Sequence, residues 1–127
     1  MKNTSEKGNK FEEKVYRLLE GELNNNRLFV NPNHSKIFHK KGYYSKDRKS
    51  NIIVDISIEV FLAGAEEYSL LIIIECKNYS HSIPVDEVEE FFTKLQQISG
   101  ANIKGIVAAT NSFQKSTLNF SKSKGLG

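Results

Sequence analysis

The segment Leu70-Leu71-Ile72-Ile73-Ile74-Glu75-Cys76-Lys77 is the strongest indication of the fold in this sequence. Its apolar run is far too short to span a membrane, and an unbroken run of this length is typical of a β-strand that is covered on both faces. We therefore expect residues 68–77 to form a central strand between helices. Glu75 and Lys77 follow the apolar run and, being two residues apart, project from the same face.

A second apolar segment, residues 52–62, precedes this strand and is separated from it by Ala63-Gly64-Ala65. The two segments predict a β-hairpin. In a hairpin centred near Ala65, opposite residues have numbers that sum to about 130, so Asp55 faces Glu75. Adjacent carboxylates repel unless a cation lies between them, which predicts a divalent metal site with Asp55 and Glu75 as ligands.

Hard carboxylate oxygens with open coordination positions suit Mg²⁺, which usually keeps waters and binds a substrate phosphate. Such an ion polarises a phosphoryl oxygen and activates a bound water. Lys77 beside it could orient that water or stabilise developing charge. These three residues together predict phosphodiester hydrolysis. The alternative is a structural ion pair of Lys77 with Glu75 or Asp55 at the end of the strand.

An amphipathic helix is expected before the hairpin, because Phe11, Val15, Leu18 and Leu19 recur at helical spacing and Gly21 stands at its expected end. At about 100° per residue, Glu12 lies at the edge of the apolar stripe, whereas Glu13 lies almost opposite the stripe. Only Glu12 is therefore expected to lean over the sheet. The alternative is that both acids merely favour the positive first turn.

The rest of the chain completes an α/β pattern. A second helix is expected after Pro84, with Asp86 and Glu89 at capping-box spacing. Residues 103–109 predict a strand parallel to residues 71–77, because a helical crossover joins them. A third helix is expected from residue 111 to residue 124. The predicted fold class is a mixed central β-sheet flanked by helices.

Composition bounds the class of protein. A chain of 127 residues with 39% apolar and 26% charged residues suits a single globular domain over residues 1–127. The lone Cys76 excludes a disulfide framework and is expected to be a small core residue. The polar first ten residues do not fit a signal peptide, so we expect a cytoplasmic protein. His34, His39 and His81 show no metal-ligand spacing and are expected to be solvated.

Charge is distributed unevenly although the net charge is only +3. Residues 34–49 carry six Lys or Arg side chains and a Tyr-Tyr pair, and they are expected to be loop-like. These side chains could grip phosphates and stack on bases, with a merely solvated loop as the alternative. The candidate nucleic-acid contacts are Lys40, Lys41, Tyr43, Arg48 and Lys49.

The spacing of Asp55, nineteen residues and Glu75-Cys76-Lys77, after a helix that opens Gly8-Asn9-Lys10-Phe11-Glu12, resembles the PD-(D/E)xK nuclease superfamily. The similarity is to its Mrr-like branch and includes the strand and helix around residues 104–113. The resemblance covers residues 8–127 and implies a restriction-endonuclease-like fold, Mg²⁺ as cofactor and DNA as substrate. It also implies that Asp55 and Glu75 are metal ligands, Lys77 is the catalytic lysine and Glu12 is the acid that the first helix contributes.

The family continues beyond the position of Gly127 with another strand, so the sequence also fits the amino-terminal part of a longer protein. The expected function is that of a Mg²⁺-dependent endodeoxyribonuclease in restriction, defence or repair, for which a homodimer would suit cleavage of two strands. Two alternatives remain open. One is a catalytically inactive nucleic-acid-binding domain, and the other is a partner-binding domain that docks through its acidic helix at residues 86–90.

Overall fold

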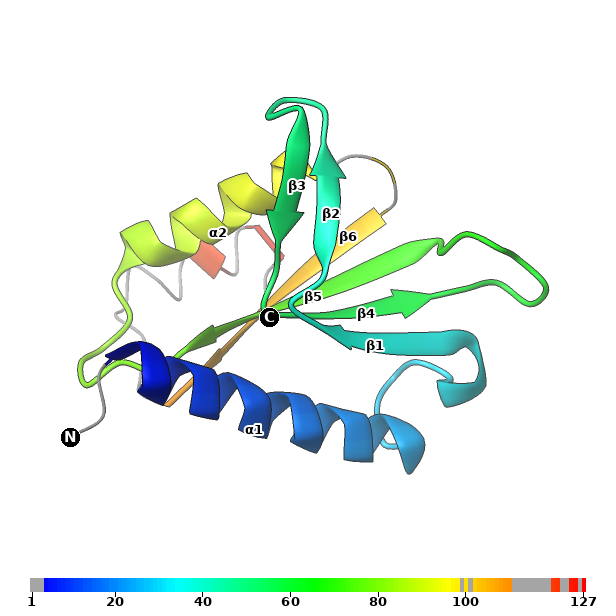
Figure 1. Ribbon diagram of the computed structural model, residues 1–127, viewed down its shortest axis with the longest axis horizontal. Helices are drawn as coiled ribbons and strands as arrows, with labels where there is room; N and C mark the ends of the chain where they lie inside the picture. Colours follow the sequence, from blue (N-terminus) through cyan, green and yellow to red (C-terminus); the bar gives the residue numbers. More distant parts are fainter. Residues whose placement is uncertain (1–3, 99, 101, 111–119, 122–123, 126) are drawn as a thin grey trace.

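The computed structural model describes residues 4–98, 100, 102–110, 120–121, 124–125 and 127. Along these residues the structure places helices α1 and α2, a short 3-10 helix and strands β1 to β6 (Figure 1). Their bounds are α1 Thr4–Asn24, η1 Pro32–His34, β1 Ser35–His39, β2 Gly42–Ser45, β3 Ser50–Ile53, β4 Ile56–Val60, β5 Leu70–Lys77, α2 Val85–Gln97 and β6 Asn102–Ala109. Neither helix is long and apolar enough within the described residues to cross a membrane.

The central sheet has the strand order β1-β4-β5-β6. β4 pairs with β5 antiparallel, and the pair Ile56 and Ile74 has the predicted register. β5 pairs with β6 in parallel from Leu70 opposite Asn102 to Lys77 opposite Ala109. The predicted mixed α/β sheet is therefore confirmed.

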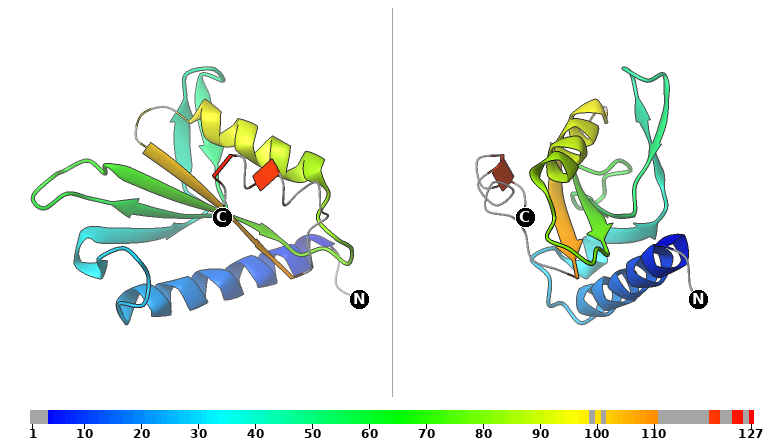
Figure 2. Two further views of the ribbon diagram at one scale, coloured as in Figure 1. Left: turned by 180° about the vertical axis from the view of Figure 1, so that it is seen from behind. Right: turned by 90° about the vertical axis from the view of Figure 1, so that its left-hand side faces the viewer.

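Alternate residues of β5 pack into two separate hydrophobic clusters. Ile72 and Ile74 pack in the cluster that includes residues of α1, whereas Leu71 and Ile73 pack in the cluster that includes Phe91 of α2. The two helices accordingly lie on different faces of the sheet (Figure 2). Burial on both faces explains why the strand is apolar without alternation.

The first strand of the expected hairpin is in fact two strands. The segment divides at Val54 and Asp55, so β3 leaves the sheet and pairs with β2 in a two-stranded ribbon, while β4 remains in the sheet. The ribbon projects beside α2 (Figure 1), where its Tyr43 and Ile52 join the core of that face. The break places Asp55 between two differently oriented strands.

The basic region that was expected to be a loop contains β1 and β2. β1 is an edge strand that pairs antiparallel with β4, and none of its residues is fully buried. Edge strands of this kind carry polar side chains and lack a strong apolar pattern, which is why the sequence did not reveal them. Gly42 permits the close approach of β3, because an added Cβ would lie 3.1 Å from atoms of Asn51 and Ile53.

One predicted helix boundary and one predicted cap were wrong. α1 continues past Gly21 to Asn24, and the left-handed backbone of Asn26, with φ of 56°, follows its end. α2 begins at Val85, directly after Pro84 as expected, but Pro84 is its N-cap and no side chain caps it, so Asp86 lies in the first turn instead. The expected third helix falls mostly outside the described residues.

Candidate active site

Asp55 lies at the break between β3 and β4 and is held from two sides. Its carbonyl oxygen accepts a hydrogen bond from the N–H of Lys40 at 3.0 Å. Its carboxylate Oδ2 accepts a hydrogen bond from the N–H of Cys76 at 2.8 Å. The second contact ties Asp55 to the end of β5, next to Glu75, as the hairpin register predicted.

Glu12 reaches this place from the first half of α1, and its side chain is only 5% exposed. Its Oε1 lies 3.0 Å from Nζ of Lys40, and its Oε2 lies 3.1 Å from Nε2 of His39. Glu13, by contrast, is exposed and pairs with Arg17 along the same helix. The structure thus separates the two neighbouring acids as their helical angles suggested.

The side chains of Glu75 and Lys77 lie at the end of β5 and are mostly buried. Lys77 Nζ is 3.8 Å from Glu75 Oε2 and 3.2 Å from Glu87 Oε2. Lys94 Nζ is 3.9 Å from the other oxygen of Glu75. Two residues of α2, Glu87 and Lys94, therefore complete the surroundings of the motif.

Sequence reasoning missed Glu87 and Lys94 as members of the site. Residues 86–90 were interpreted only as an acidic patch of a possible docking helix. The two residues are seven positions apart, which places them on one face of α2 about two turns apart. That spacing, together with the short connection from β5, was the signal that could have identified them.

The three acids have unequal affinities for protons. Burial raises the pKa of Glu12, and the hydrogen bond with Asp55 raises it further. Burial likewise raises the pKa of Glu75, against the opposing effect of Lys94. Burial acts to raise the pKa of Asp55 as well, but hydrogen bonds from Glu12, the Cys76 N–H and Glu75 outweigh it, so that this pKa is lowered.

Carboxylates that lie close together in a partly buried place repel one another. Glu12, Asp55 and Glu75 therefore cannot all be ionised at low cost unless cations lie among them. Lys40 supplies one positive charge at 3.7 Å from Asp55 Oδ1. The cluster has the electrostatic character of a cation-binding site.

Lys77 is fully charged in these surroundings. Burial acts to lower the pKa of Lys77, but the charge of Glu75 and the hydrogen bond to Glu87 outweigh it, so that the pKa is raised. A lysine in this state cannot accept a proton at neutral pH. It can donate hydrogen bonds and stabilise negative charge on a neighbouring group.

An open pocket of about 530 Å³ lies beside Glu75 and Lys77 and is bounded by α2. Arg48 stands at its wall, with Nε donating to Oε1 of Gln97 at 2.7 Å. The pocket lining carries three cationic side chains and five acidic ones: Arg48, Lys77 and Lys94, and Glu75, Asp86, Glu87, Glu89 and Glu90. Such a mixture suits a phosphate group bound together with a metal ion.

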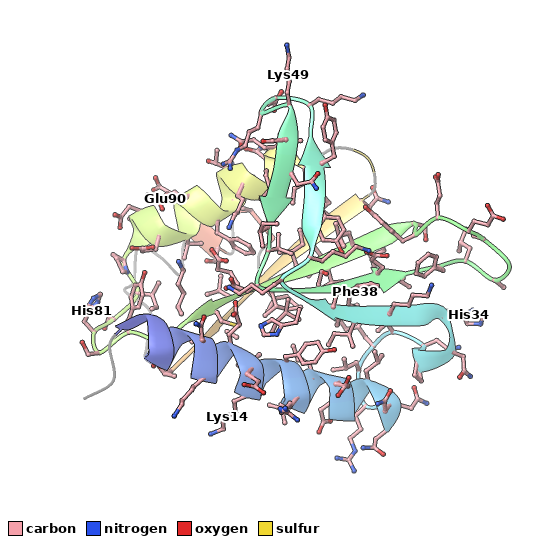
Figure 3. All side chains as sticks on the ribbon, in the orientation of Figure 1. Lys14, His34, Phe38, Lys49, His81 and Glu90 are labelled. Carbon is pink, nitrogen blue, oxygen red and sulfur yellow. The ribbon has the colours of Figure 1, made fainter. Side chains whose placement is uncertain are left out.

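The five residues predicted to contact nucleic acid lie in different surroundings. Lys40 lies among the carboxylates, and Lys41 forms an ion pair with Glu59. Tyr43 is only 5% exposed and its hydroxyl bonds to Ser57 and Glu59, so the expected stacking of its ring on a base does not fit its burial. Arg48 and Lys49 lie in the connection between β2 and β3, and Lys49 points outward at its tip (Figure 3).

Two further expectations concern single residues. His39 was expected to be solvated, but its ring stacks on Tyr16 and its Nε2 contacts Glu12. Cys76 packs against the core on the α1 side, as expected, and burial raises its pKa to about 12. A buried thiol with so high a pKa is a poor nucleophile.

The described residues contain no ready-made group of three or more His, Cys, Asp or Glu side chains with the geometry to hold a metal ion. Mg²⁺ does not require one, because it usually binds one or two carboxylates and completes its shell with water and substrate. Asp55 offers Oδ1, which lies near Lys40, and Glu75 offers two oxygens near lysines. This donor set fits a hard divalent cation.

Comparisons with known proteins identify the family and the fold of the chain. Residues 34–126 match the family model Mrr_cat, described as "Restriction endonuclease". A solved structure described as "Crystal Structure of Protein of Unknown Function AF1548" superposes with a TM-score of 0.64 at 13% sequence identity. The match covers 91% of this chain but 53% of that one, so the chain spans about half its length. No curated protein matches the sequence.

Proposed function

Because the chain belongs to the Mrr_cat restriction endonuclease family of the PD-(D/E)xK superfamily, we propose that it is a Mg²⁺-dependent endodeoxyribonuclease acting in restriction, defence or repair. The observation that carries the proposal is the convergence of Glu12, Asp55, Glu75 and Lys77 at the end of β5. Buried like charges at one strand end cost stability, and a catalytic role accounts for their being there.

Asp55 and Glu75 would hold the metal ion. The Cys76 N–H bonds to Oδ2 of Asp55 and so orients the carboxylate, whose Oδ1 lies near Lys40. When bound, Mg²⁺ would supply a polarised phosphoryl oxygen and a water of lowered pKa. Glu12 would add to the negative charge around Asp55 that attracts the ion.

Lys77 would act on charge that develops at the phosphate. Its side chain is fixed between Glu75 and Glu87, so its Nζ does not have to be ordered during the reaction. A preorganised cation stabilises a transition state more than a mobile one, because its orientation has no reorganisation cost. Lys77 would also orient the attacking water through one of its N–H groups.

DNA would approach the face that carries the pocket and the β2–β3 ribbon. Arg48 at the pocket wall and Lys49 at the ribbon tip are suited to contact backbone phosphates. Lys41 and Tyr43 hold Glu59 and would support the ribbon from within. Contacts of this kind position the duplex without reading its sequence.

The experiment is cleavage of a supercoiled plasmid with Mg²⁺, with Mn²⁺ and with EDTA. The wild-type protein should nick or linearise the plasmid with either metal and not with EDTA. Asp55→Asn should lower the rate by at least ~10²-fold, because the amide is a poor ligand for a hard cation. The matched control is Glu13→Gln, which removes an exposed carboxylate from α1 and should cleave like the wild type. Unchanged cleavage by Asp55→Asn would overturn the proposal.

A further inference from the structure

Lys40 has an unusual position for a lysine of a basic region. It follows β1 directly, has a left-handed backbone with φ of 58°, and is fixed there by its N–H bond to the Asp55 carbonyl. Its side chain is 51% exposed, yet its Nζ lies 3.0 Å from Glu12 Oε1 and 3.7 Å from Asp55 Oδ1. The ammonium group thus joins two acids from α1 and from the sheet.

The two acids present specific oxygens to Lys40. The Cys76 N–H occupies Oδ2 of Asp55, and His39 contacts Oε2 of Glu12. Oε1 of Glu12 and Oδ1 of Asp55 lie 3.0 Å and 3.7 Å from Lys40 Nζ. Oδ1 is also the oxygen of Asp55 that a metal ion would use, since Oδ2 is already bonded to the backbone.

We propose that the ammonium group of Lys40 occupies the cation position beside Asp55 in the metal-free protein, and that a divalent metal must displace it in order to bind. The proposal rests on the proposed function, because it assumes that Asp55 is a metal ligand. Lys40 is then a resident counter-ion that sets the apparent metal affinity.

Electrostatics supports displacement over coexistence. An ammonium group and a divalent ion a few Å apart at Asp55 would repel strongly in a partly desolvated site. The doubly charged ion gains more from the carboxylates than Lys40 does. Lys40 can leave at low cost, because its half-exposed four-carbon side chain can turn into water while its backbone bond to Asp55 persists.

Displacement also has a thermodynamic consequence. If Lys40 and the metal compete for Asp55, each weakens the other by the same factor, as linkage requires. Removing the ammonium group should therefore tighten metal binding. It should also reduce the stability of the metal-free protein, because Glu12 and Asp55 lose their shared counter-ion.

The first test measures the accessibility of lysines in the wild-type protein without DNA. Acetylation by a limiting amount of acetic anhydride, mapped by peptide mass spectrometry, is compared with EDTA and with saturating Mg²⁺. Lys40 should react at least ~3-fold faster with Mg²⁺, because it loses its carboxylate partners. Lys49 is the internal control, since it is exposed, has the same left-handed backbone at φ of 53° and should react equally in both conditions.

The second test is a titration with Mg²⁺ alone by calorimetry, on the wild type, Lys40→Met and Lys49→Met. Methionine keeps a long unbranched side chain and removes the charge. Lys40→Met should bind Mg²⁺ about fivefold more tightly, whereas Lys49→Met should match the wild type. If Lys40→Met does not fold, the labelling of Lys40 in the wild-type protein still tests whether Mg²⁺ displaces it.

The outcomes separate the two proposals. Faster labelling of Lys40 alone upon Mg²⁺ binding supports displacement. Binding of Mg²⁺ with unchanged labelling of Lys40 overturns it and leaves the metal site intact. Absence of Mg²⁺ binding to the wild type overturns the metal site itself, and displacement with it.

Discussion

Asp55, just before β4, and Glu59, within β4, lie four residues apart, and both are acids held close to a lysine. Glu59 is neutralised by Lys41 and accepts a hydrogen bond from Tyr43 at 2.7 Å. Asp55 instead lies against two further carboxyl groups, Glu12 and Glu75. A buried acid whose charge is balanced by a lysine and a hydrogen-bond donor is structural, whereas a buried acid next to other carboxylates indicates a cation site.

The largest effect on activity within this comparison is expected from Lys77. Lys77→Met should lower the rate of plasmid cleavage by ~10²- to 10³-fold, because it removes a preorganised cation beside the reacting phosphate. Binding of Mg²⁺ should change little, because Asp55 and Glu75 remain. Cleavage assays and calorimetry on the same variant measure both effects. A variant that cleaves at the wild-type rate would remove Lys77 from the catalytic group.

Removing the ion-pair partner of Glu59 should lower the stability of the protein. Lys41→Met leaves Glu59 buried without its ion-pair partner, which should reduce the free energy of unfolding by about 2–3 kcal/mol. Urea denaturation followed by circular dichroism measures the loss. The matched control is Lys36→Met, which replaces an exposed lysine of β1. It should change the free energy of unfolding by less than about 0.5 kcal/mol. Equal stabilities of the two variants would break the distinction between the two regions.

Glu12 should have a smaller effect that Glu13 does not share. Glu12→Gln keeps the size of a buried side chain and removes one charge next to Asp55, so cleavage should fall by about tenfold through weaker metal binding. Raising the Mg²⁺ concentration should partly restore the rate. Glu13→Gln is the control, since its carboxylate is exposed and pairs with Arg17. Equal activities of both variants would assign Glu12 to helix stabilisation alone.

The smallest effect is expected on DNA affinity. Replacing Arg48 and Lys49 by Ala should weaken DNA binding several-fold, with little dependence on sequence, because these residues are proposed to touch phosphates only. The slope of log K against log salt should become shallower by about 1.8, that is, 0.9 for each phosphate contact. Lys14→Ala, on the exposed face of α1 away from the ribbon, is the control (Figure 3). Identical slopes for the wild type and the double variant would mean that Arg48 and Lys49 are solvated loop residues that do not contact DNA.

The sequence allowed the central part of the fold to be predicted, because burial leaves a strong pattern. The unbroken apolar run of β5 required cover on both faces, and the hairpin register then brought Asp55 next to Glu75. The helical angle of Glu12 likewise followed from the apolar stripe of α1. Both arguments depend on local periodicity, which a single sequence contains.

Contacts between distant segments could not be predicted in the same way. β1, β2 and β3 are four or five residues long and carry many polar side chains, so no period identifies them. The burial of Tyr43 depends on the ribbon folding over the sheet, and the approach of Glu87 depends on how α2 crosses the end of β5. The contact of Lys40 depends on a left-handed turn that its residue type does not suggest.

Calorimetric titration with Mg²⁺ of the wild type, Asp55→Asn and Glu59→Gln tests most directly whether the acids at the end of β5 form a cation site. Each variant exchanges one carboxylate, just before β4 or within it, for an amide of the same shape. The wild type and Glu59→Gln should bind one Mg²⁺ with similar affinity, whereas Asp55→Asn should bind at least ~30-fold more weakly, because a hard cation loses a charged ligand. If Asp55→Asn has the native circular dichroism spectrum and binds Mg²⁺ with wild-type affinity, the acids at the end of β5 do not form a cation site.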